Sequence, residues 1–494
     1  MTNDLGRKTL SGVYWTGSTK IVTQTLSWVS MLVVARILTP GDFGLMGIAG
    51  IFSEFVQYLA EFGAGAVVIQ RKEITSEEVD GLFWVAMANS FVLSAVMVIG
   101  APGIGDFFHS PQLAKILRVV AISFVAYPFC TIQYALLSKD MRFDVRSKID
   151  FVVDICAIVM LLSCALLGLG VWSLVVSLMT RSVMTTFMLS RATRYCPSFK
   201  VSYATVRPLL KFGMSIVGGR FLYYSYVRLD AVIIGRYCSP PLVGAYTMAM
   251  QLATVPVERL TSLLGGIQYA AFAKLQDSPA ELRQFFRSFS RAYAVISFPL
   301  LGGLIYLANE FVHVVLSDKW QATVVPMQIL AIMGLFKSIS VQVPFLLNAR
   351  GKPHLPVRIY LVSFLFLIPG FFIGAEYAGL IGVALAWGCI YPPIALYTIY
   401  LGLRATNSTV REFVLNLTPA ATSAVVMLAG LAAWSSVTDG VFAEWPQLVC
   451  KVLLGAIVYV ATLLALFSQS RRDLTYLLGH YPGVLRLFSR GNTA

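Results

Sequence analysis

Long apolar runs, separated by short polar segments, cover most of the chain. A helix that crosses a bilayer needs about 20 predominantly apolar residues, and the runs predict fourteen such helices. Two breaks are inferred from run length: residues 150–190 are interrupted by GLG at 168–170, and residues 357–401 are interrupted near Glu376. The predicted helices span residues 11–35, 42–64, 79–100, 113–136, 150–168, 171–190, 208–233, 242–266, 289–308, 324–346, 357–374, 379–401, 418–435 and 446–467.

A short phrase occurs twice, 200 residues apart. ARILTPGDFG at residues 35–44 and GRYCSPPLVG at residues 235–244 share an Arg, a Pro and a Gly at the same spacing. Each phrase joins the first helix of a half to the second, with an even number of helices between them, so the halves form a parallel repeat. We interpret the Pro as a helix stop, the Gly as a tight turn and the Arg as a snorkelling side chain.

The repeat predicts the domain organisation. We expect an all-α polytopic membrane protein with two six-helix lobes in parallel pseudo-repeat around a central cavity, followed by two extra helices. The expected parts are an N-lobe at 1–190, a cytoplasmic linker at 191–207, a C-lobe at 208–402, helices 13 and 14 at 418–467, and a cytoplasmic tail at 468–494.

The charge distribution supports this topology. The chain is 57% hydrophobic, 13% charged and carries a formal net charge of +14. With the N-terminus in the cytoplasm, 26 Lys and Arg fall in cytoplasmic segments, 6 in outer segments, among them Lys451, and 6 within helices. This asymmetry places both termini in the cytoplasm. The positive net charge therefore indicates contact with anionic membrane lipids rather than with nucleic acid.

The sequence gives no sign of a cofactor, a resident metal or ATP hydrolysis. The seven cysteines form no C-x-x-C pair, and the four histidines lack metal-ligand spacing. No G-x-x-x-x-G-K-[ST] loop is present. We therefore expect neither a cofactor nor a metal, and we expect the protein not to be an enzyme.

Polar side chains inside the predicted spans are candidates for a substrate cavity. An ionisable residue at mid-bilayer costs roughly 2.5–3.5 kcal/mol, so it usually faces water or a partner. These residues concentrate on helices 1, 2, 7 and 8, the matched first pairs of the two halves. The candidates are Lys20, Glu54, Gln57, Tyr58, Glu61, Arg220, Tyr224, Arg228, Asp230, Glu258, Arg259 and Lys337.

Spacing refines these candidates. Lys20 and Arg220 place one cation at the same level of each half, and the polar residues from Glu54 to Glu61 follow helical spacing on one face. Lys20 and Glu54 lie at similar predicted depths, which would allow them to pair. Snorkelling of both cations toward the cytoplasm remains the alternative.

For other charged residues in the predicted helices, two interpretations stay open. Arg228 and Asp230 do not share a helix face, so each needs another partner or water, unless both are interfacial. Glu258 and Arg259 are either cavity residues or a structural pair. Arg181 is read as a lipid-edge or packing residue.

The opening of the chain resembles a known family. Residues 11–49 (SGVYWTGSTKIVTQTLSWVSMLVVARILTPGDFGLMGIA) and residues 59–75 (LAEFGAGAVVIQRKEIT) resemble Wzx-like polysaccharide exporters of the multidrug/oligosaccharidyl-lipid/polysaccharide (MOP) superfamily. The resemblance implies a flippase that moves oligosaccharides linked to undecaprenyl pyrophosphate across the bacterial inner membrane by alternating access, for surface polysaccharide biosynthesis. It implies a lipid-linked oligosaccharide substrate, with other polysaccharide-assembly proteins as partners.

Two rival functions stay open at this point. A drug/cation antiporter of the same superfamily would typically have twelve helices, and a membrane polysaccharide polymerase or ligase would need a large outer loop. The acidic candidates Glu54 and Glu61 suggest a coupling ion, either a proton or sodium.

Overall fold

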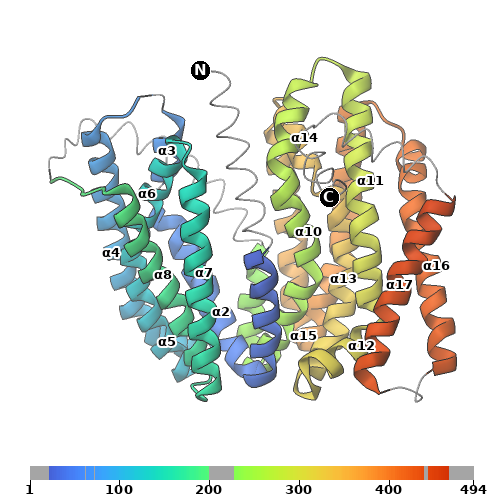
Figure 1. Cartoon of the computed structure of the whole chain (residues 1–494), viewed down its shortest axis with the longest axis horizontal. Coiled ribbons are helices and arrows are strands. Elements are labelled where there is room, and N and C mark those ends of the chain that lie inside the picture. Colours follow the sequence, from blue (N-terminus) through green and yellow to red (C-terminus); the bar gives the residue numbers. More distant parts are fainter. Residues whose placement is uncertain (1–21, 62, 72, 200–226, 439–442, 467–494) are drawn as a thin grey trace, which may run out of the picture. The chain divides into compact units, whose positions relative to one another are not determined.

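The computed structural model describes residues 22–61, 63–71, 73–199, 227–438 and 443–466. In these ranges the chain is almost entirely helical and contains no strand (Figure 1). Within them, nine helices are long and apolar enough to cross a membrane, and a shorter apolar helix runs over Val22–Ile37. The chain is therefore a multi-pass helical membrane protein, while the number fourteen stays a prediction.

Two compact units divide the chain at Gly244. In the first unit, α7 and α8 form a long antiparallel hairpin, and α2 contacts α4, α5, α6 and α8. A further helical segment covers residues 227–237. The elements of this unit are α2 (Pro40–Glu61), α3 (Ala64–Gln70), α4 (Ser76–Phe107), α5 (Pro111–Ile122), the 3₁₀ turn η1 (Ser123–Ala126), α6 (Tyr127–Lys139), α7 (Phe143–Leu166) and α8 (Val171–Thr193).

In the second unit α11 is a central element, because it packs against both α13 and α16. α10 crosses the unit boundary, because its first five residues, 240–244, belong to the first unit. α17 packs along α16. The elements are α10 (Pro240–Lys274), α11 (Pro279–Tyr306), α12 (Ala308–Phe311), η2 (Val312–Leu316), η3 (Asp318–Thr323), α13 (Val324–Ser340), α14 (Val343–Ala349), α15 (His354–Thr406), α16 (Val410–Thr438) and α17 (Glu444–Leu466). The predicted helices 13 and 14 correspond to α16 and α17.

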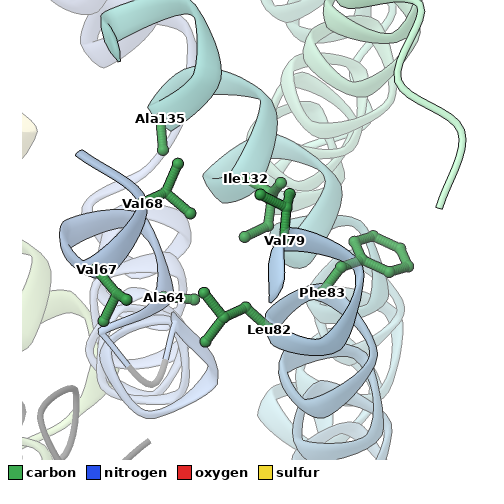
Figure 2. Packing of buried hydrophobic residues seen from close by; sticks show 8 residues of the cluster. All are labelled: Ala64, Val67, Val68, Val79, Leu82, Phe83, Ile132 and Ala135. Atoms are coloured by element: carbon green, nitrogen blue, oxygen red, sulfur yellow. The ribbon is translucent and has the colours of Figure 1, made fainter. Parts of the chain in front are cut away.

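A buried apolar cluster joins α3, α4 and α6 in the first unit (Figure 2). Small residues let α3 approach α6, since a Cβ on Gly65 would lie 3.1 Å from Thr131 Cγ2. Phe83 is fully buried and fills the space beside them. The cluster consists of Ala64, Val67, Val68, Val79, Leu82, Phe83, Ile132 and Ala135.

Arg71, the residue directly after α3, has a structural role. Arg71 forms a 3.0 Å ion pair with Glu78. Glu78 also completes a capping box with Thr75 at the start of α4, in which each residue binds the other's backbone N–H. Arg71 and Glu78 therefore help to fix the entry into α4.

The repeated phrase is a helix start and a helix crossing, which corrects its interpretation as a stop and a turn. Pro40 and Pro240 are the first residues of α2 and α10, where the missing N–H costs nothing. Gly44 lies inside α2 against the matching phrase: a Cβ there would be 1.9 Å from the Pro240 carbonyl oxygen, and one on Gly244 would be 1.8 Å from that of Pro40. The glycines are needed for this reciprocal backbone contact.

Both predicted breaks in the long apolar blocks are confirmed. α15 contains non-helical backbone at Ala378 and Gly379, close to the expected position at Glu376. Gly379 adopts φ 53°, ψ −129°, and Gly170, which precedes α8, adopts φ 55°, ψ −133°. These two glycines therefore make the same turn in the two halves, in a region that other residues rarely enter.

Lys451 has a buried ionic contact, while its assignment to an outer segment stays a prediction. Lys451 lies in the second turn of α17, and its side chain is fully buried. Its ammonium group contacts Glu310 Oε1 at 2.7 Å. A buried lysine needs such a partner, so this pair joins α17 to α12 within the second unit.

Candidate functional site

Two ion pairs bring together four of the twelve predicted site residues. In the first unit, Arg228 Nη2 lies 3.0 Å from Glu54 Oε2 and 3.2 Å from Glu54 Oε1. The pair links α2 to the helical segment 227–237. Arg228 thus has the separate partner that its helix position required.

Both side chains of this pair are partly exposed. Glu54 is 44% exposed and Arg228 is 43% exposed. At 1.5 Å per residue, Glu54 lies about 21 Å from the start of α2 and about 10 Å from its end. A charge in hydrocarbon is unfavourable by roughly 2.5–3.5 kcal/mol, so a hydrated space beside this pair stays the prediction.

The second ion pair links α10 to α13 in the second unit. Lys337 Nζ lies 3.5 Å from Glu258 Oε1, with Lys337 25% and Glu258 57% exposed. Arg259, the next residue on α10, is exposed. Glu258 therefore has a partner on α13, and both interpretations of Glu258 and Arg259 stay predictions.

The remaining predicted site residues differ in their environment. Gln57 is exposed, one turn after Glu54 on α2. Asp230 is only 3% exposed, and its carboxylate accepts a hydrogen bond from the Ala231 N–H at 2.7 Å. Its burial removes it from any open surface of the segment 227–237.

Other predicted site residues lie outside the part of the chain that the structure describes. The described ranges leave out Lys20, Arg220 and Tyr224 altogether, and the side chains of Tyr58 and Glu61. The predicted pairing of Lys20 with Glu54 therefore stays a prediction, as does the polar stripe beyond Gln57.

The sequence interpretation missed a polar cluster on α6, α7 and α8. Arg181 forms an ion pair with Asp154, and the Tyr134 hydroxyl donates to Asp150. Arg146 lies 3.9 Å from Asp150. The sequence carried a signal for this cluster, because Asp150 and Asp154 share a helix face at i, i+4 within an apolar run. The Arg181 side chain is 53% exposed, and its interpretation as a lipid-edge or packing residue stays a prediction.

The sequence matches the model of a known protein family. The model of a family described as polysaccharide biosynthesis protein matches residues 33–325, more than half of the chain. The chain belongs to this family. The match contains the first copy of the repeated phrase, the second copy, and Glu54 and Arg228.

Proteins of several polysaccharide biosynthesis systems are similar in sequence to this chain over most of their length. The lipopolysaccharide biosynthesis protein WzxC of Escherichia coli (strain K12) is 27% identical over 420 residues, covering 84% of this chain and 85% of WzxC. The teichuronic acid biosynthesis protein TuaB of Bacillus subtilis (strain 168) is 24% identical over 480 residues, covering 95% and 98%. The succinoglycan biosynthesis transport protein ExoT of Rhizobium meliloti (strain 1021) is 26% identical over 352 residues, covering 70% of each chain.

Solved structures of two transporters share the fold of this chain. The lipid II flippase MurJ in an inward closed conformation has a TM-score of 0.69 at 13% identity, covering 91% of this chain and 98% of MurJ. An inward-facing MATE multidrug transporter of the MOP superfamily has a TM-score of 0.61 at 12% identity, covering 76% and 94%. The chain therefore has the fold of MOP-superfamily transporters.

Proposed function

We propose that this protein is a flippase that moves a lipid-linked oligosaccharide across a membrane for polysaccharide biosynthesis. The observation that carries the proposal is the family match over residues 33–325, which contains the charged pair Glu54–Arg228. Curated relatives with names in lipopolysaccharide, teichuronic acid and succinoglycan biosynthesis support it. Their polymers differ, so the shared task is handling a glycan carrier rather than one particular sugar.

The proposed substrate class is an oligosaccharide linked to undecaprenyl pyrophosphate. Its phosphates and hydroxyls would lose hydration in hydrocarbon without replacement. Arginine and lysine side chains compensate phosphate charge through charge-assisted hydrogen bonds. In this proposal Arg228, Arg259 and Lys337, together with Lys20 and Arg220, supply cations, while Gln57 and tyrosines bind sugars.

The proposed mechanism is alternating access in the bacterial inner membrane, with both termini in the cytoplasm. The charge asymmetry of the sequence supports this orientation. Transport, and not catalysis, is the proposed activity.

The proposal includes a coupling ion, a proton or sodium, that competes with Arg228 for Glu54. Release of Glu54 from its ion pair would free a carboxylate for the ion and a guanidinium for phosphate. Uptake into vesicles with and without a proton or sodium gradient tests this step. Equal transport under both conditions would contradict it.

A gene deletion tests the proposed function in cells. We expect cytoplasmic-leaflet accumulation of lipid-linked oligosaccharide in the deletion strain, and its disappearance when the wild-type gene is restored. The drug/cation antiporter alternative makes a different prediction: unchanged lipid-linked intermediates with increased sensitivity to cationic drugs.

A further inference from the structure

A cationic pocket lies between α11 and α16, away from the ion pair of α10 and α13. Its volume is about 330 Å³. All but one of its lining residues come from the first turns of α11, and the last comes from α16. They are Ala280, Arg283, Gln284, Arg287, Ser288, Arg291 and Asn416.

Three arginines with one turn between neighbours give the pocket its charge. Arg283, Arg287 and Arg291 follow i, i+4, i+8 spacing, so they share one face of α11. Like charges at this spacing repel each other by roughly 0.2–0.5 kcal/mol per pair. The lining contains no acidic side chain. Glu412, one turn before Asn416 on α16, is not among the lining residues, and the cluster keeps a positive charge even when Glu412 is counted.

The arginines are held in place by neutral acceptors. Asn416, 2% exposed, accepts from Arg291 Nε at 3.0 Å and from Arg291 Nη2 at 2.8 Å. Its amide group donates to the Arg287 carbonyl oxygen at 2.8 Å. Arg283 Nε donates to the Thr406 carbonyl oxygen at 3.4 Å. These contacts with uncharged groups orient the guanidinium groups of Arg283 and Arg291, whereas the Arg287 contact involves its backbone.

The pocket lies at the level expected for lipid headgroups. α11 has 28 residues, or about 42 Å at 1.5 Å per residue, against a hydrocarbon thickness of about 30 Å. About eight residues at one end therefore extend beyond the hydrocarbon, and the apolar run predicted from residue 289 assigns them to the N-terminal end. They include Arg283, while Arg287 follows directly after them and Arg291 lies one turn further along α11. The charge count predicts that this end is cytoplasmic.

We propose that the pocket formed by Arg283, Arg287, Arg291 and Asn416 binds a phosphate group, as presented by the headgroup of an anionic glycerophospholipid or by free phosphate. Basic pockets between membrane helices on the cytoplasmic side suit anionic headgroups, and guanidinium groups bind phosphate through paired hydrogen bonds. This site is separate from the substrate cations proposed above, and it does not depend on the transported molecule.

The test compares lipid binding by the purified full chain and its variants. Native mass spectrometry in detergent with phosphatidylglycerol measures bound lipid, with phosphatidylcholine as the zwitterionic reference. The variant is Arg283→Gln with Arg287→Gln. Arg411→Gln is the matched control, because Arg411 is an exposed arginine at the start of α16 that does not line the pocket. Thermal unfolding of each variant checks that the fold is kept.

We expect the wild-type protein to bind phosphatidylglycerol more tightly than phosphatidylcholine. We expect the double variant to bind phosphatidylglycerol at least about tenfold more weakly than wild type, because it loses charge-assisted hydrogen bonds to the phosphate. Displacement by millimolar inorganic phosphate, lost in the double variant, would identify free phosphate as the source. Equal binding by wild type and a folded double variant, or an equal loss in Arg411→Gln, would overturn the proposal.

Discussion

At the scale of single residues, the charged positions were predictable but many of their partners were not. Ionisable residues inside apolar runs identified Glu54, Arg228 and Lys337 from sequence alone. The structure pairs Glu54 with Arg228, 174 residues away, and Lys337 with Glu258. Periodicity assigns a residue to a helix face, but it does not tell which distant helix packs against that face. The Asp154–Arg181 pair was missed for the same reason.

The Glu54–Arg228 pair gives a prediction for activity. Glu54→Gln leaves Arg228 without its carboxylate, and Arg228→Gln leaves Glu54 without its guanidinium. Because the two groups act as one unit, we expect each single variant to lower transport by about tenfold or more and the double variant to lose little further. Complementation of a deletion strain, quantified by surface polysaccharide, measures this.

Arg181→Gln is the control for that series, because it removes an arginine of another ion pair in the same unit. Losses that simply multiply in the double variant would contradict a coupled role for Glu54 and Arg228.

His313 gives a prediction for pH dependence. It lies between α12 and η3, outside the membrane-spanning segments, and hydrogen bonds to Asp318 and Glu444 raise its pKa above the ordinary value. A raised pKa in the folded state means that the stabilisation is complete below the unfolded value of about 6.5 and is lost as pH rises through the folded value.

Thermal unfolding of wild type and His313→Gln in detergent measures this effect. We expect wild type to unfold at a higher temperature than the variant at about pH 6, and the difference to vanish by about pH 9. A difference that stays constant over this range would show that the histidine acts through packing instead of charge.

At the scale of elements, apolar runs predicted helices, and the length of two runs predicted breaks at GLG 168–170 and near Glu376. The interruptions at Gly170 and Gly379 were found because each follows a run too long for one span. The role of the repeated phrase was not found. A Pro followed by a Gly is compatible with a turn or with a helix start, and only the reciprocal contact of Gly44 and Gly244 decides between them.

The crossing at Gly44 predicts a loss of stability. In Gly44→Ala the new methyl group would lie 1.9 Å from the Pro240 carbonyl oxygen, so the backbones must separate. We expect destabilisation of about 1–3 kcal/mol, as for overpacking at other tight contacts. Thermal unfolding in detergent provides the measurement.

Gly50→Ala on the same helix is the matched control, since a Cβ there meets nothing within 4 Å. It is expected to be neutral or to stabilise α2 by up to about 1 kcal/mol. If Gly44→Ala were as well tolerated as Gly50→Ala, the close crossing would not be required.

At the scale of the whole molecule, the class of protein was predictable because its causes are distributed over the chain. A sequence that is 57% hydrophobic and 13% charged, with repeated apolar runs, belongs in a bilayer. The resemblance to Wzx-like exporters is confirmed by membership of the polysaccharide biosynthesis protein family. The MOP-superfamily fold is confirmed by the similarity to MurJ. Such global features do not identify the glycan.

The most direct test of the central claim uses purified protein in proteoliposomes. A fluorescent oligosaccharide linked to undecaprenyl pyrophosphate is placed in both leaflets, and a membrane-impermeant reagent quenches the outer one. The account predicts that wild-type protein makes nearly all of the lipid accessible to quenching and that Glu54→Gln slows this process. Accessibility that stays at the level of protein-free vesicles, with intact and correctly folded protein present, would contradict it.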